Sequence, residues 1–151
     1  MRGGYSPIIY GPGGLAKFLV PVGKTQTKYL TADVTTDTTM SDLTFSNLIV
    51  GQWYSISLNG AFVVPSTGAD NIQIKILNSS QIGLMQSASQ FSGGSAVQNL
   101  NHYVEFLAAS TSVTFDSSSV SVGSSIIGNS SITETFVTLS EIPAKQVTTD
   151  W

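Results

Sequence analysis

The clearest pattern in the chain is a regular alternation of apolar and polar residues across 52–64. Tyr54, Ile56, Leu58, Phe62 and Val64 share one set of alternate positions, and Ser55, Ser57 and Asn59 share the other. Successive side chains of a β-strand point to opposite faces, so a repeat of two residues predicts a strand with one buried face. We therefore expect a half-buried strand that ends at Pro65.

Other short segments have the same character and are separated by residues that favour turns. The expected strands are 43–50, 71–77, 82–85, 101–109, 112–116 and 131–143, with a brief one around Val120 and Val122. The stretches 65–70, 86–98 and 123–130 are rich in small and polar residues and are expected to be loops. Many short strands without a convincing helix predict an all-β fold, a jelly-roll β-sandwich that spans residues 43–143.

The last expected strand, within 131–143, departs from the simple alternation. Phe136 points to one face, whereas Val137 and Leu139 point to the other. A strand with apolar side chains on both faces needs cover on both faces. The opposite sheet covers one of them, and we expect a second copy of the chain to cover the other.

The N-terminal residues 1–42 have a different character from the rest. Residues 1–24 are rich in glycine, and Pro7, Pro12 and Pro21 exclude a helix. This stretch is nevertheless too apolar for a solvated linker. We expect an extended, irregular N-terminal arm that lies against the body or against a partner. The residues expected to dock on a partner are Arg2, Tyr5, Ile8, Tyr10, Lys17 and Phe18. Residues 144–151 are expected to form a polar C-terminal tail.

Charge is scarce and unevenly placed along the chain. Charged residues make up 10% of it, against about 25% in ordinary domains. Residues 1–32 carry +4 and the remainder carries −7, which together give the net charge of −3. A basic arm on an acidic body suggests two different partners, although a chance fluctuation in a charge-poor chain gives the same numbers. Four dispersed basic residues make a weak phosphate-binding surface, so we expect no nucleic acid partner.

The chemistry available for catalysis is limited. The absence of cysteine excludes disulfides and thiolate metal sites. His102 is the only histidine, and it is more consistent with a strand-end residue than with a catalytic triad. Glu105, Glu134 and Glu141 lie in expected strands, where paired carboxylates could cleave glycosides, but a solvent or interface position fits them better. We expect a non-enzymatic protein without a cofactor or metal.

No apolar run approaches the roughly 20 residues that a membrane helix requires, so membrane insertion is not expected. The N-terminus also lacks the apolar core of a secretory signal. We therefore expect a protein that is made in a cytoplasm and used as made.

The body resembles the tumour-necrosis-factor/C1q-like jelly roll. The resemblance is carried by GQWYSIS at 51–57, by the strand at 101–109 and by FVTLSEI at 136–142. It implies a homotrimer whose last strand lies near the three-fold axis. The residues that it places at the trimer interface are Tyr54, Phe136, Val137 and Leu139.

The chain has no cysteine, it is rich in Ser, Thr, Asn and Gln, and its last expected strand ends in TLSEIP at 138–143. In these features it also resembles small virion proteins of tailed bacteriophages, which join an irregular N-terminal anchor to a trimeric jelly roll. This resemblance implies a capsid decoration, cement or head-fibre protein that binds the major capsid protein or another virion protein. An alternative is a tail-fibre or baseplate tip that binds a host surface glycan through Gln90, Phe91 and Ser92. A glycan hydrolase that uses Glu105 and a cellular C1q-like adhesion module are the remaining alternatives.

Overall fold

The chain folds as two packed antiparallel β-sheets. The computed structural model describes residues 23–64, 67–92, 96–118, 120, 123–128 and 134–143. Its elements in chain order are β1 (Thr25–Tyr29), β2 (Thr38–Thr39), the 3-10 helix η3 (Ser41–Leu43), β3 (Trp53–Val64), β4 (Thr67–Asn78), β5 (Ser80–Ser92), β6 (Ala96–Leu107), β7 (Thr114–Ser118), β8 (Ser125–Ile126) and β9 (Phe136–Ile142). The expected all-β fold is thus confirmed.

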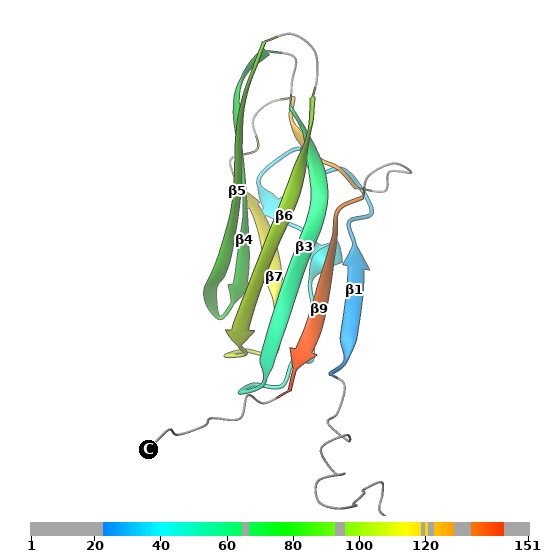
Figure 1. The fold of residues 1–151 in the computed structure, drawn as a ribbon, viewed down its shortest axis with the longest axis vertical. Coiled ribbons are helices and arrows are strands. Elements are labelled where there is room, and N and C mark those ends of the chain that lie inside the picture. The colour runs from blue at the N-terminus through cyan, green and yellow to red at the C-terminus, as the bar shows by residue number, and fades with distance from the viewer. Residues whose placement is uncertain are drawn as a thin grey trace, which may run out of the picture.

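The order of the strands is that of a jelly roll. One sheet has the order β1-β9-β3-β6, with the short β8 beside β3, and the other has the order β2-β7-β4-β5. The strands pair antiparallel as β1 with β9, β2 with β7, β3 with β6, and β4 with the next strand β5. The chain therefore behaves as one long hairpin whose successive strand pairs alternate between two sheets, which is the double Greek-key arrangement. Figure 1 shows the sheet β1-β9-β3-β6 in front of β7.

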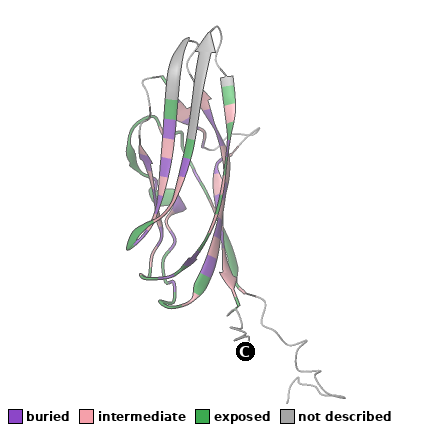
Figure 2. Ribbon diagram, turned by 60° about the vertical axis from the view of Figure 1, so that its left-hand side comes forward, coloured by how far each residue is buried: buried purple, intermediate pink, exposed green. Residues whose placement is uncertain are grey.

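The alternation in the sequence correctly identified the core face of the central strands. Ile72, Ile74 and Ile76 of β4 are fully buried, and so are Ile56 and Leu58 of β3. Figure 2 shows the resulting change of burial from residue to residue along the strands. The largest fully buried side chains come from both sheets and from the segment before β3: Phe45, Phe62, Phe115, Met40, Leu43, Ile56, Leu58, Ile72, Ile74, Ile76, Leu100 and Ile126.

Residues 25–42, expected in the arm, are part of the sandwich instead. The backbone of β1 pairs with β9 along its whole length, and β2 pairs with β7. Leu30 and Met40 are buried in the core. Because threonine forms strands well but carries little apolar pattern, this Thr-rich stretch gave no clear signal before its partner strands were known. Residues 1–22 and 144–151 lie outside the described residues.

The expected strand at 43–50 is also corrected. Its start lies in η3, and Phe45 makes only an isolated bridge with Val113. Asn47 has a φ of 63°, which interrupts extended backbone. The apolar residues of this segment do not form a strand of either sheet. Leu43, Phe45 and Leu48 are instead buried, and they pack into the core.

Two of the expected loops are largely strand. Pairing of β4 with β5 continues as far as Thr67 opposite Ser92, and pairing of β3 with β6 continues as far as Val64 opposite Ala96. Residues 67–70 and much of 86–98 are therefore extended. Backbone hydrogen bonds between neighbouring strands do not require apolar side chains, so these Ser- and Gln-rich extensions were invisible to the hydrophobic pattern.

Candidate functional site

The candidate site is the outer face of the sheet β1-β9-β3-β6, on the side away from the core. Alternate residues of each strand supply it, and the strand register aligns them in rows across the sheet. The set, called the outer face below, consists of Thr25, Thr27 and Tyr29 from β1, Phe136, Thr138, Ser140 and Ile142 from β9, Trp53, Ser55, Ser57 and Asn59 from β3, and Asn101, Tyr103, Glu105 and Leu107 from β6.

Hydroxyl groups fill the centre of the outer face. The Thr25 and Ser140 hydroxyls lie 3.1 Å apart, as do the Thr27 and Thr138 hydroxyls. Each pair joins directly opposite residues of β1 and β9, so each of these hydroxyls has a hydrogen-bond partner within the protein. A surface of small, mutually bonded hydroxyls is flat and can be covered at a low desolvation cost.

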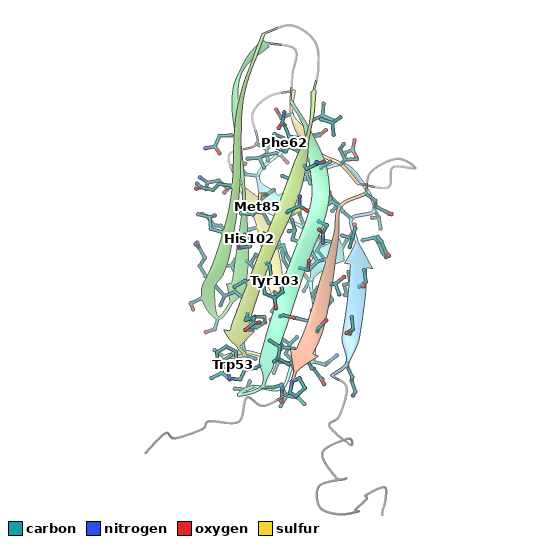
Figure 3. The ribbon with its side chains drawn as sticks, in the orientation of Figure 1. Trp53, Phe62, Met85, His102 and Tyr103 are labelled. Carbon is teal, nitrogen blue, oxygen red and sulfur yellow. The ribbon has the colours of Figure 1, made fainter. Side chains whose placement is uncertain are left out.

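Aromatic residues lie on both sides of this hydroxyl centre. Tyr29 and Phe136 are direct neighbours on β1 and β9, with ring centroids 5.7 Å apart. Tyr103 is 60% exposed, and its hydroxyl donates to Glu105 Oε1 at 2.9 Å. Figure 3 shows Tyr103 midway along β6 and Trp53 at the end of β3. These rings make the outer face partly apolar as well as flat.

One end of the outer face continues into an exposed apolar patch. Trp53 is opposite both Ile142 and Leu107, so the three side chains form a row across β9, β3 and β6. The turn before β3 adds Ile49 and Val50, which are 63% and 58% exposed, to Trp53 and Leu107 at 36% and 48%. The end patch is defined as Ile49, Val50, Trp53, Leu107 and Ile142.

Hydrogen bonds hold the turn of the end patch in place. The Gly51 amide donates to Ala108 O at 2.8 Å, and the Gln52 amide donates to Ile49 O at 3.1 Å. The Ile49 amide donates to the Tyr54 hydroxyl at 2.9 Å, and Gln52 Nε2 donates to Ile142 O at 2.7 Å. These bonds fix the backbone of the turn, so Ile49 and Val50 are exposed in the folded chain. Exposed apolar patches often mark interaction surfaces.

The outer face is poor in charge compared with the other sheet. Glu105 is its only charged side chain. The opposite surface, on β4 and β7, carries Lys75 directly across from Asp116. Two such faces repel one another only weakly when they come together, even though the whole chain is acidic. Chemically, it is suited to binding by apolar contact and by neutral hydrogen bonds.

Three of the four residues expected at a subunit interface lie inside the single chain. Tyr54, Val137 and Leu139 are buried in the core, and the Tyr54 ring stacks on Phe106 with centroids 5.9 Å apart. Their burial removes them from contact with any second copy that binds the folded chain. Phe136 is the one member of the set on the outer face, half-buried beside Tyr29. The β1 strand, which the sequence pattern did not reveal, supplies part of the cover that Phe136 was expected to need from another copy.

The residues expected in a ligand loop lie in a strand, and the residues expected to dock on a partner lie outside the described part of the chain. Gln90, Phe91 and Ser92 belong to β5, where they pair with Ala69, Gly68 and Thr67, and not to a loop. Their side chains lie outside the described residues. So do Arg2, Tyr5, Ile8, Tyr10, Lys17 and Phe18, and their docking stays a prediction.

The ionisable residues considered for catalysis are dispersed. His102 is partly buried on the core side of β6, close to Gly83. Glu105 lies on the outer face, and Glu141 accepts a hydrogen bond from the Lys24 amide at 3.2 Å. A small pocket beside this contact is lined by Lys24, Gln26, Ser46, Asn47, Leu48, Tyr54, Leu139 and Glu141. Among the described residues, no three His, Asp or Glu side chains are grouped to bind a metal.

The pKa of the Asp42 carboxyl group is displaced from its ordinary value. The Thr31 hydroxyl and the Thr31 amide both donate to its Oδ2. These bonds favour the ionised form and lower the pKa of Asp42 below its ordinary value of 3.8. The contact joins two segments of the sandwich wall, so its role is structural.

Within the part of the chain that the structure describes, no helix is long and apolar enough to cross a membrane. The sequence matches no protein-family model, and it matches no curated protein significantly.

Apart from Glu105, the outer-face residues of β1 and β6 are not among those that the sequence pattern predicts at an interface. A signal for two of them was present, because Tyr103 and Leu107 alternate with Val104 and Phe106 in the strand expected at 101–109. Large apolar residues on the second face of an otherwise half-buried strand mark a face that is also covered.

Proposed function

We propose that this chain is a non-enzymatic structural protein of a bacteriophage virion, a decoration, cement or head-fibre protein. Its jelly roll forms a homotrimer and projects from the particle, while residues 1–22 bind the major capsid protein or another virion protein. The observation that supports self-assembly is the outer face, a broad sheet surface with a single charge and several partly exposed rings. The virion assignment follows the resemblance of the whole chain to phage anchor-and-jelly-roll proteins.

Repulsion between like charges limits which surface of one copy can approach another. Each chain carries a net charge of −3, so two copies repel one another over most of their surface. The outer face carries a single charged side chain, Glu105, so this repulsion is weak there. Its central hydroxyls already bond to one another, so covering them leaves few unsatisfied polar groups. A stable interface uses about 20–30 residues a side, so the 15 residues of the outer face would form the centre of such an interface.

The test compares two lysine substitutions at opposite surfaces of the same sandwich. Thr138→Lys places a charge in the centre of the outer face, and Gln86→Lys places the same charge on exposed β5 of the other sheet. Sedimentation equilibrium at micromolar concentration should give about 48 kDa, three times 15.9 kDa, for the natural chain and for Gln86→Lys. Thr138→Lys should sediment as a folded 15.9 kDa monomer, with folding checked by circular dichroism.

A natural chain that is monomeric at micromolar concentration would contradict the trimer, as would a Thr138→Lys variant that still forms one. The location is tested separately. Peptide mass spectrometry of purified particles of the encoding phage should detect the chain, and its absence from such particles would contradict the virion assignment.

A second candidate is a receptor-binding tip for a host glycan, and Tyr103 favours it. Its ring is exposed on the edge strand β6, between Asn101 and Glu105 on the same face. An exposed aromatic face beside amide and carboxylate groups suits an apolar sugar face rimmed by hydroxyls. Because Tyr103 lies on the outer face, this candidate requires that face to be free of a second copy. Glycan-array binding by the natural chain that is lost in Tyr103→Ala would favour the tip over the decoration protein.

A further inference from the structure

The end patch is an exposed apolar surface, and the chain enters β1 next to it. Ile142, Trp53 and Leu107 form a row across three strands, and the fixed turn at Ile49 and Val50 lies at its end. All five residues are apolar. Exposing several apolar side chains at one end of the sheet to water is unfavourable, so a further segment or partner is expected to cover them.

The leading part of the chain starts in the same row. Thr25 is opposite Ser140, so continuing the antiparallel register by two residues sets Gly23 opposite Ile142. The pairing does continue, because the Glu141 amide donates to Lys24 O at 2.8 Å and the Lys24 amide donates to the Glu141 carboxylate. A Cβ at residue 23 would lie 2.1 Å from Glu141 O, so the backbone of Gly23 is packed directly against β9.

We propose that residues 15–22 of the chain itself cover the end patch by crossing the row from Gly23 toward Leu107. From β1 to β6 the row spans three strand spacings, about 14 Å at about 4.8 Å each. An extended chain covers that distance in about four or five residues at roughly 3.3 Å per residue. Phe18, Leu19 and Val20 are therefore within reach of Ile142, Trp53 and Leu107, apolar against apolar.

This docking divides the leading segment into two parts with different roles. Residues 15–22 complete the end of the sandwich, and residues 1–14, with Arg2, Tyr5, Ile8 and Tyr10, remain for an external partner. Lys17 and Phe18 are thereby reassigned from the external docking set to the chain's own surface. The inference does not rest on the virion role or on the trimer. It assigns the row of Ile142, Trp53 and Leu107 to the chain's own segment and leaves the remainder of the outer face for a second copy.

The test uses Trp53 as a reporter in the full-length chain. Trp53 and Trp151 are its only tryptophans, so a Trp151→Phe background leaves Trp53 as the single indole. In that background, Phe18→Ser with Leu19→Ser should shift the Trp53 emission to longer wavelength and make acrylamide quenching steeper. The matched control, Tyr5→Ser with Ile8→Ser, removes similar apolar groups from the far part of the segment and should leave both readouts unchanged.

Three outcomes would overturn the proposal. Unchanged Trp53 emission and quenching in Phe18→Ser/Leu19→Ser would mean that residues 15–22 do not cover the end patch. An equal change in the control pair would mean that the effect is not local. Protection of Trp53 that is lost on dilution of the unsubstituted single-tryptophan chain would identify a second copy as the occupant.

Discussion

Asn78 and Ala109 join the end of β4 to the turn after β6. Asn78 is 1% exposed, and its Oδ1 accepts a hydrogen bond from the Ala109 amide at 2.7 Å. The Asn78 amide nitrogen donates to Ser112 O at 2.7 Å and to Ser110 O at 3.1 Å. One buried side chain thus replaces the backbone pairing that the turn lacks, and it ties together strands of the two sheets.

Asn78→Ala is therefore expected to be strongly destabilising. The change leaves several backbone groups of the 109–112 turn without their partner, which costs about 2–3 kcal/mol of unfolding free energy. Urea denaturation measures the loss. The exposed Gln86→Ala on β5, outside the outer face, is the control and should cost within about 0.5 kcal/mol. A loss in Asn78→Ala no larger than in the control would show that the turn holds without this side chain.

Acid should weaken the fold partly through Asp42. Its pKa is lowered in the folded chain by the Thr31 hydroxyl and amide, so the ionised carboxylate stabilises the fold above pH 3.8. That contribution is lost as the pH falls through the lowered folded pKa. The stability difference between the natural chain and Asp42→Asn should thus be constant near neutral pH and shrink below pH 3.8.

Urea denaturation at a series of pH values measures this difference. Thr31→Val removes the hydroxyl donor and should reduce the same acid dependence. A difference between the natural chain and Asp42→Asn that does not vary with pH would show that the Thr31 contacts leave the carboxyl unaffected.

Two glycines should respond differently to asparagine. Gly51 has a φ of 86° with open space around it, and asparagine tolerates left-handed backbone, so Gly51→Asn should cost less than about 1 kcal/mol. At Gly128 a Cβ would lie 2.4 Å from Ala32 O, a backbone atom that cannot move aside. Gly128→Asn should cost about 1–3 kcal/mol through overpacking. Thermal unfolding of both variants checks the order, and equal costs would contradict it.

Lys28 is expected to stabilise the sandwich although it is a cation on the core side of β1. Its ammonium donates to Thr44 O and lies 5.5 Å from the centroid of the Phe45 ring. Lys28→Met keeps the apolar stem and removes the charge, at an expected cost of about 1–2 kcal/mol. Lys24→Met is the control at an exposed position and should be nearly neutral in the same denaturation measurement. Equal stability of the two variants would rule out a role for the ammonium contacts.

The candidate site was harder to predict than the fold. Tyr54 shares its alternate positions with Ile56 and Leu58, so its place in the core could be inferred, yet the resemblance assigned it to an interface. The outer face depends on which strands are neighbours. Trp53, Leu107 and Ile142 lie 35 or more residues apart along the chain, and only the register between β9, β3 and β6 aligns them.

The sequence by itself determined the all-β class and the buried face of the central strands, because alternation is a local property of a few consecutive residues. It did not determine what covers the second face of β9. Val137 and Leu139 enter the core, and Phe136 packs on Tyr29 of β1, a strand with almost no apolar pattern of its own. The extensions of β4, β5 and β6 were likewise decided by backbone pairing between strands. Pairing of this kind joins residues that are distant in sequence, so only the tertiary structure could specify it.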